Sequence, residues 1–240
     1  MTTSAQPESA AFADTLEELR AATARLVGTA RAATPEQLGA PSPLPGWSRA
    51  HVLSHVAQNA LGLRNLAAWA ATGVRTPMYA SQEQRDADIE AGARQDAAAL
   101  VGQVADTAAE LDADLAALPP EALARTVEGR GGQRLPASTL AFMRLREVEV
   151  HHVDLGLDYG IADWDAAFAR RAVEGLVAVW QGRDLLPPVR ITATDTGLDA
   201  VSGSGATSVT GTTAQLLGWL LSRPGAEVRI QGPAVDLPAL

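Results

Sequence analysis

The sequence of 240 residues contains no cysteine. Disulfide bonds, thiolate metal ligands, iron–sulfur clusters and a cysteine nucleophile are therefore excluded, and any thiol chemistry requires a thiol from another molecule. The sequence also has no apolar run near the roughly 18 to 20 residues of a membrane span, and its first residues lack the pattern of a signal peptide. We therefore expect a soluble, cytoplasmic protein without a membrane partner.

Basic residues are in the minority, since 19 Lys and Arg stand against 28 Asp and Glu and give a formal net charge of −9. A surface with this balance repels phosphate backbones, so we expect no nucleic-acid partner. Apolar residues make up 47% of the chain, which is enough for one large domain or two smaller ones and excludes global disorder. Because no sustained heptad pattern occurs, a monomer is the simplest expectation.

The first two thirds of the chain are rich in alanine and leucine, and segments with proline and glycine divide them into four long stretches. In each stretch apolar residues recur at the helical spacing of about 3.6 residues. Ser48 is the expected N-cap of the second helix, which ends before Gly73. We expect helices over residues 14–32, 48–72, 89–118 and 136–156, and these suggest a bundle.

After residue 160 the pattern changes, because short stretches of alternating apolar and polar residues, typical of strands, now separate the helices. The segment Gly203-Ser204-Gly205 lacks the glycine spacing and the lysine of a phosphate-binding loop, so we interpret it as a connection between strands. The sequence predicts an α+β protein with a four-helix bundle over residues 1–160 and a small α/β domain over residues 161–240. Within the second domain we expect helices over 164–180 and 213–222, and strands over 189–194, 206–211 and 227–231.

All four histidines fall on two of the expected bundle helices, at positions 51, 55, 151 and 152. Glu147 and His151 are four residues apart, so their Cβ atoms lie about 6 Å apart on one helix face. With one histidine of the second helix, His51 or His55, they would supply two imidazoles and one carboxylate to a metal ion. Three protein ligands leave a coordination position open, which is typical of a catalytic zinc site rather than a structural one.

Simpler interpretations of the same residues exist. A Glu–His pair on a helix is most often a solvated hydrogen-bonded pair, and a histidine beside the ligands, such as His152, is an exposed or supporting residue. Asp154 is a surface residue or the carboxylate that orients His151. The tryptophans are interpreted mainly as packing residues; they are Trp47, Trp69, Trp164, Trp180 and Trp219.

Longer motifs resemble a known family. Residues 46–56 (GWSRAHVLSHV) resemble the signature of the DinB-like metal-binding bundles. Residues 77–79 (PMY), 136–138 (PAS) and especially 146–156 (REVEVHHVDLG) are similar to the mycothiol-dependent maleylpyruvate isomerase branch of that superfamily. These segments span most of the expected bundle.

The resemblance implies that His55, Glu147 and His151 are the ligands of Zn²⁺. It also implies a small α/β domain after the bundle and an arginine near the C-terminus that takes part in activity, which would be Arg223. The implied reaction is the cis–trans isomerisation of maleylpyruvate to fumarylpyruvate through reversible addition of the mycothiol thiolate. Because this substrate carries two carboxylates and the protein is acidic, local arginines must attract it, and the candidates are Arg85, Arg144 and Arg223.

Two alternatives remain open at this stage. A bundle that presents a thiolate could transfer mycothiol to an electrophile, as a mycothiol S-transferase does, and would then consume the thiol. The protein could also be a non-catalytic module that binds a small ligand, with the metal absent or structural. An assay of maleylpyruvate turnover, with mycothiol present in catalytic amount or omitted, distinguishes these hypotheses.

Overall fold

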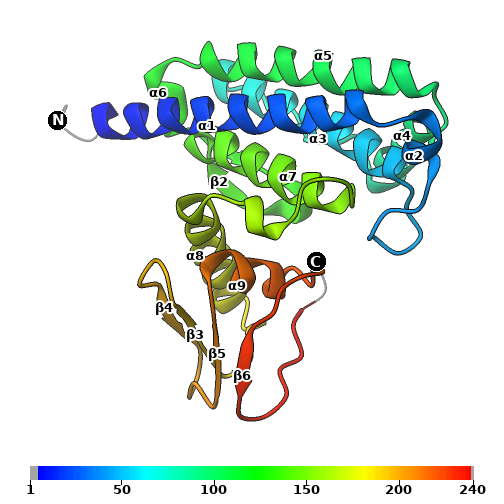
Figure 1. Ribbon diagram of the computed structural model, residues 1–240. Coiled ribbons are helices and arrows are strands. Elements are labelled where there is room, and N and C mark those ends of the chain that lie inside the picture. Colours follow the sequence, from blue (N-terminus) through cyan, green and yellow to red (C-terminus); the bar gives the residue numbers. More distant parts are fainter. Residues whose placement is uncertain (1–4, 239–240) are drawn as a thin grey trace. The chain divides into compact units, whose positions relative to one another are not determined.

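The structure is a computed structural model that describes residues 5–238 (Figure 1). The chain divides into two compact units, Met1–Asp158 and Tyr159–Leu240. The boundary thus falls after residue 158, whereas the sequence predicted residue 160. The first unit is almost entirely helical and the second combines helices with a sheet, so the predicted α+β class is confirmed.

The first unit consists of long helices, two short helices and a small hairpin (Figure 1). Helix α3 lies at its centre and packs against α4, α5 and α7, while α1 packs against α5 and α7. The helices are α1 (Ala5–Ala32), α2 (Pro35–Gly39), α3 (Arg49–Thr72), α4 (Gln82–Ala93), α5 (Ala97–Ala116), α6 (Pro120–Leu123) and α7 (Leu140–Asp154). Strands β1 (Thr126–Glu128) and β2 (Arg134–Pro136) form the antiparallel hairpin, with the 3₁₀ turn η1 (Arg130–Gly132) between them and η2 (Ala137–Thr139) before α7.

The ends of α3 follow the sequence signals. The hydroxyl of Ser48 accepts a hydrogen bond from the backbone N–H of His51, and the imidazole of His51 accepts one from the backbone N–H of Ser48. This reciprocal arrangement satisfies two donors that a helix start leaves free. At the other end Gly73 adopts a left-handed conformation with φ of 76°, which glycine tolerates without steric cost.

The single helix expected over residues 89–118 is wrong, because the structure has two helices, α4 and α5, separated at residues 94–96. Asp96 ends the continuity: its carboxylate accepts hydrogen bonds from the backbone N–H groups of Ala98 and Ala99 and so caps a new helix. Apolar residues in this alanine-rich segment keep the helical spacing across the break, so the spacing did not reveal it. The glycine-rich segment 128–134 contains the turn of the β1–β2 hairpin.

Leucine side chains from the central helices form the core of the first unit. Each of the following has a relative exposure of 1% or less: Leu26, Leu53, Leu63, Leu66, Leu100, Leu111, Leu115, Leu140 and Leu145. Burial of each side chain contributes about 2 kcal/mol relative to exposure. This packing holds α3 and α7 against each other.

The second unit contains a four-stranded sheet in the order β4-β3-β5-β6. Strand β3 (Val189–Ala193) pairs in parallel with β5 (Thr207–Gly211), and β4 (Asp199–Val201) and β6 (Arg229–Gln231) add antiparallel edges. Helix α9 (Thr213–Leu220) contacts α8 (Ala166–Gly182) and both central strands. A short 3₁₀ segment, η3 (Ile161–Asp163), precedes α8. The predicted strands and helices of this unit are confirmed within two residues, while β4 was not predicted.

None of the helices formed by residues 5–238 is both long enough and apolar enough to span a membrane.

Candidate metal centre

Helices α3 and α7 bring together the three residues that the sequence singled out. On α7, Glu147 and His151 lie one turn apart, and their Oε2 and Nε2 atoms are 3.6 Å apart. On α3, His55 points its Nε2 atom at the same carboxylate oxygen, at 3.1 Å. One donor atom of each residue lies within 4.8 Å of the others. We call these three residues the His–Glu–His cluster.

His151 is held in one orientation by a carboxylate. Its Nδ1 atom lies 2.9 Å from Oδ2 of Asp154, one turn further along α7 and fully buried. A carboxylate accepts the Nδ1 proton and thereby fixes the ring so that Nε2 faces Glu147. The predicted orienting role of Asp154 therefore has the geometry that it requires.

His55 has a different environment. Its side chain is 8% exposed, and its Nδ1 atom lies 3.0 Å from Nη2 of Arg85 on α4. The indole of Trp47 lies beside it, with ring centroids 5.7 Å apart and an angle of 54° between the ring planes. The ring of His151 meets that of His55 edge to face, with centroids 4.5 Å apart. His55 is thus enclosed by aromatic rings and by a guanidinium.

The cluster shifts the protonation equilibria of its members. Burial lowers the pKa of His151, but hydrogen bonds to Asp154 and Glu147 outweigh it and raise the pKa to about 9. Burial raises the pKa of Glu147, yet its bonds to the two histidines hold that pKa well below its usual value. Burial dominates at His55 and lowers its pKa, although Glu147 opposes this. Without a metal, the carboxylate is therefore ionised and paired with a protonated His151.

The donor set fits a divalent metal ion of the zinc type. Two imidazole nitrogens and one carboxylate oxygen are ligands that Zn²⁺ accepts, and the carboxylate reduces the charge that such an ion would bring into the bundle. The protonated His151 currently balances that carboxylate, so a bound cation would replace one proton. Among the described residues, this is the cluster of His, Asp and Glu whose donor atoms converge closely enough to hold an ion.

The other two histidines serve the fold. The Nδ1 atom of His51 lies 2.7 Å from the hydroxyl of Ser48, and its ring stacks near Trp47 with centroids 6.3 Å apart. The expectation that His152 is exposed or supports the ligands needs correction, because it is 2% exposed and its Nε2 atom lies 2.8 Å from the hydroxyl of Thr29 on α1. Because α7 has 3.6 residues per turn, His152 faces α1 and not the cluster.

The three candidate arginines lie in different surroundings. Arg85 contacts His55 and places its guanidinium 5.7 Å from the ring centre of Tyr79. Arg144 is 1% exposed and donates hydrogen bonds to the carbonyl of Val56 and to Asn59, so it ties α7 to α3. Arg223 lies three residues beyond the end of α9 in the second unit, where its Nη1 donates to the carbonyl of Leu221. Its predicted catalytic role stays a prediction.

Sequence reasoning missed two supporting contacts. Arg85 was considered as a substrate-binding residue and not as a neighbour of His55, since nothing in the sequence relates positions thirty residues apart on different helices. Arg49, at the start of α3, donates from Nε to the carbonyl of Leu155 and from Nη2 to that of Gly156, which satisfies acceptors at the end of α7. Its position within the motif 46–56 is the signal that could have identified it.

Comparisons with known proteins agree with this geometry. The family model described as the mycothiol maleylpyruvate isomerase N-terminal domain matches residues 19–156. A crystal structure of a mycothiol-dependent maleylpyruvate isomerase is similar with a TM-score of 0.88 and 28% sequence identity, over 95% of this chain and 96% of that chain. A crystal structure of a histidine-to-alanine mutant of such an enzyme gives a TM-score of 0.87 and 27% identity over the same shares. No curated protein matches the sequence significantly.

The matched segment of the family model covers more than half of the chain and contains the whole His–Glu–His cluster. The chain is an enzyme that belongs to the mycothiol maleylpyruvate isomerase family.

Proposed function

We propose that this enzyme is a zinc-dependent isomerase that converts maleylpyruvate to fumarylpyruvate with mycothiol as its thiol cofactor. The convergence of His55, Glu147 and His151 supports the proposal most directly, because a family named for a thiol cofactor needs a group that keeps the thiol ionised. The absence of cysteine in the chain is consistent with a borrowed sulfur. The two solved structures named for this activity are 28% and 27% identical to the chain.

The chain's own residues would hold a metal ion and leave a coordination position for the thiol. His55 and His151 present imidazole nitrogens, Glu147 supplies the negative charge, and Asp154 fixes the ring of His151. The indole of Trp47 packs beside the ring of His55. When bound, Zn²⁺ would lower the pKa of a coordinated thiol so that it is a thiolate near neutral pH.

The proposed reaction balances without an oxidant or reductant. The mycothiol thiolate adds to the cis double bond that is conjugated with the carbonyl, and the electron pair of that bond moves into an enolate. The former double bond is then single and rotates. Collapse of the enolate expels the thiolate, which leaves the trans double bond and the free thiol cofactor. The substrate carries two carboxylates, and Arg85 and Arg223 are the proposed arginines that attract it.

An assay of maleylpyruvate turnover by ultraviolet absorbance tests the proposal, with catalytic mycothiol present or omitted. We expect turnover only with the thiol, and the mycothiol concentration should be unchanged after many turnovers. Turnover that is independent of mycothiol would contradict the proposal. Stoichiometric consumption of the thiol would instead indicate a mycothiol S-transferase. The cytoplasmic location and the monomeric state stay predictions from the sequence.

A further inference from the structure

The loop between α3 and α4, which carries the motif 77–79 (PMY), borders a cavity of about 250 Å³. The turn of the β1–β2 hairpin forms the opposite side of this space, which we call the hairpin cavity. Gly131 and Gly132 have φ of 74° and 78° in that turn, so no side chain projects from them into the cavity. The polar residues that line the hairpin cavity include Arg75, Tyr79, Gln82, Glu128 and Arg130.

Arg130 supplies a positive charge to the hairpin cavity that no ion pair neutralises. Arg75 is paired with Glu128 at 3.3 Å. Asp86, whose carboxylate interacts electrostatically with Arg130, is in direct contact with Arg85 at 2.8 Å instead. The guanidinium of Arg130 forms no hydrogen bond or ion pair with any of residues 5–238. An arginine in this situation is suited to hold the carboxylate of a ligand.

Tyr79 links the hairpin cavity to the His–Glu–His cluster. The hydroxyl end of its ring packs on α3 at Gly62, where a Cβ atom would lie only 2.9 Å from Cε1 and 3.0 Å from Cζ. Gly62 follows His55 by seven residues, so it lies on the same face of α3, about 10 Å along the axis. The guanidinium of Arg85 lies 5.7 Å from the ring centre of Tyr79 and contacts Nδ1 of His55. The cavity and the cluster are therefore neighbours that share no lining residue.

The hydroxyl of Tyr79 is a hydrogen-bond donor at neutral pH. Burial raises the pKa of Tyr79, although the charges of Arg85 and Arg130 oppose this shift. The loop is fixed on α3, because the preceding residue Met78 is 8% exposed and its carbonyl accepts a hydrogen bond from Nδ2 of Asn65 at 3.2 Å. A phenol held in this way can donate to an anion at little cost in conformational entropy.

We propose that the hairpin cavity binds the carboxylate of maleylpyruvate that is remote from the double bond, through Arg130 and the hydroxyl of Tyr79. This inference rests on the proposed function, in which the thiolate adds to the double-bond carbon next to the other carboxylate. The reacting carbon must then lie at the cluster, and the remote carboxylate points away from it. The chain of five bonds between them spans about 6 Å, slightly less than two extended residues. Together with the added sulfur, this length is comparable to the separation of Gly62 from His55 along α3.

Calorimetric titration of the full chain with Zn²⁺ but without mycothiol tests the site, because the substrate then binds without turnover. The probes are maleylpyruvate and cis-acetylacrylate, which keeps the enone and the near carboxylate but lacks the remote one. We expect maleylpyruvate to bind at least about tenfold more tightly. Equal affinities, or no binding of maleylpyruvate, would overturn the proposal.

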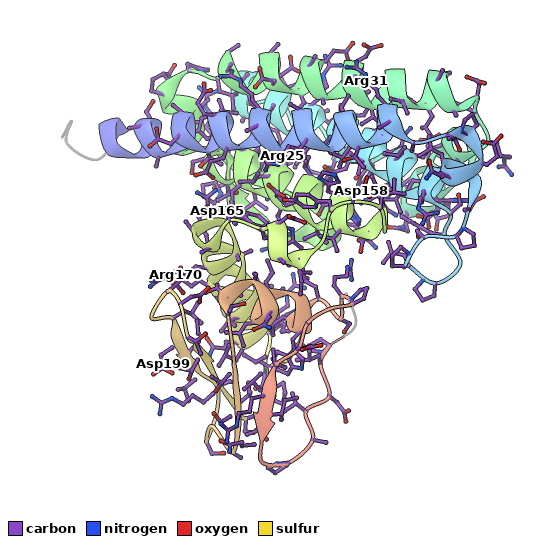
Figure 2. The ribbon with its side chains drawn as sticks, in the orientation of Figure 1. Arg25, Arg31, Asp158, Asp165, Arg170 and Asp199 are labelled. Atoms are coloured by element: carbon purple, nitrogen blue, oxygen red, sulfur yellow. The ribbon has the colours of Figure 1, made fainter. Side chains whose placement is uncertain are left out.

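Two variants that remove the same charge locate the binding. Arg130→Gln changes the hairpin cavity, whereas Arg31→Gln changes an exposed residue that Figure 2 labels on α1 and that does not line the cavity. We expect Arg130→Gln to weaken the binding of maleylpyruvate about five- to tenfold without affecting cis-acetylacrylate, since the lost contact is to the remote carboxylate. Arg31→Gln should change neither affinity. Equal weakening of both ligands in Arg130→Gln would indicate a general charge effect and refute the site.

Tyr79→Phe removes only the hydroxyl and should weaken the binding of maleylpyruvate about three- to tenfold. In steady-state kinetics both cavity variants should raise the KM for maleylpyruvate and not the KM for mycothiol. A rise in the KM for mycothiol alone would assign the cavity to the thiol cofactor and overturn the proposal.

The site and the proposed function can fail separately. Turnover with mycothiol together with equal affinities for the two probes would refute the site and leave the isomerase standing. Tight binding of maleylpyruvate that depends on Arg130, in a protein without turnover, would support the site and contradict the isomerase.

Discussion

The two imidazoles of the His–Glu–His cluster contact side chains of opposite charge through their Nδ1 atoms. His151 on α7 has the carboxylate of Asp154 behind it at 2.9 Å, whereas His55 on α3 has the guanidinium of Arg85 behind it at 3.0 Å. A carboxylate accepts the proton of Nδ1, so Nε2 of His151 can bind a cation once the second ring proton is lost. A guanidinium only donates, so Nδ1 of His55 must accept, and Nε2 then carries the proton that faces Glu147.

His151 therefore needs only to lose a proton in order to bind a metal ion, whereas His55 must also change its contact with Arg85. For His55 to bind a cation through Nε2, its proton must move to Nδ1, and that atom would then face another donor. We therefore expect Arg85 to shift away from His55 when a metal binds. The guanidinium would then be free to attract an anionic substrate near the cluster, which gives one residue two successive roles.

Replacing the carboxylate of Glu147, which both histidines contact, should have the largest effect on the affinity for Zn²⁺. Glu147→Gln keeps the shape of the side chain but removes the negative charge that both histidines contact. We expect the affinity for Zn²⁺ to fall by more than about 100-fold, beyond the loss typical of residues that only support ligands, and turnover to fall with it. Competition with a colorimetric chelator measures the affinity. Glu149→Gln, two positions away on α7, is the control, and equal losses in both variants would contradict the assignment.

The pH dependence of metal uptake tests the α7 side of the comparison. Because the pKa of His151 is raised to about 9, this imidazole is protonated at pH 7 and must lose a proton before it binds a metal. We expect the affinity for Zn²⁺ to increase about tenfold per pH unit from pH 7 to about pH 9, and then to level off. Calorimetry in buffers of different ionisation enthalpy should detect about one proton released per ion at pH 7. A flat profile in this window would show that His151 is neutral or is not a ligand.

Removing the negative charge of Asp154, which contacts Nδ1 of His151, should have a smaller effect on the affinity for Zn²⁺. Asp154→Asn keeps the size of the side chain but no longer enforces a single orientation of the imidazole proton. We expect the affinity for Zn²⁺ to fall about 10- to 100-fold and the pKa of His151 in the metal-free protein to fall from about 9. Titration by NMR follows that pKa. Asp158→Asn, on an exposed position just beyond α7, should change neither quantity.

Removing the positive charge of Arg85, which contacts Nδ1 of His55, should have the smallest effect on the affinity for Zn²⁺. This change should increase the affinity, whereas the changes above lower it. Arg85→Gln replaces the guanidinium by an amide whose oxygen can accept the Nδ1 proton of His55. We expect the affinity for Zn²⁺ to increase by about tenfold, even as substrate binding weakens. The same chelator competition detects this gain. A lower affinity would mean that Arg85 supports the metal site instead of opposing it, and the contrast between the two histidines would fail.

Local signals in the sequence predicted much of the fold. Ser48 and Gly73 mark the ends of α3 through chemistry confined to a few neighbouring residues, so they could be identified without a structure. The break between α4 and α5 could not, because the alanine-rich segment keeps a helical spacing across it and Asp96 also fits within a helix surface. Strand β4 was missed because its three residues, Asp199–Val201, do not alternate between polar and apolar as the three residues of β6 do.

The candidate site was predictable to the extent that it lies on single helices. Glu147 and His151 follow from a spacing of four residues, while the choice of His55 over His51 needed the family resemblance. The contact of Arg85 with His55 depends on how closely α4 approaches α3. That approach requires Gly92, since a Cβ at this position would collide with the hydroxyl of Ser54, which instead donates to the carbonyl of Ile89. Such packing between helices has no local signature in a sequence.

X-ray absorption at the zinc edge of the Zn²⁺-loaded protein tests the central claim most directly. We expect one zinc per chain, with imidazole scattering from two histidines, nitrogen and oxygen neighbours at about 2.0–2.2 Å, and no sulfur until a thiol is added. Addition of mycothiol should introduce a single sulfur neighbour at about 2.3 Å. A protein that binds no zinc, or a zinc spectrum that is identical in the Glu147→Gln variant, would contradict the account.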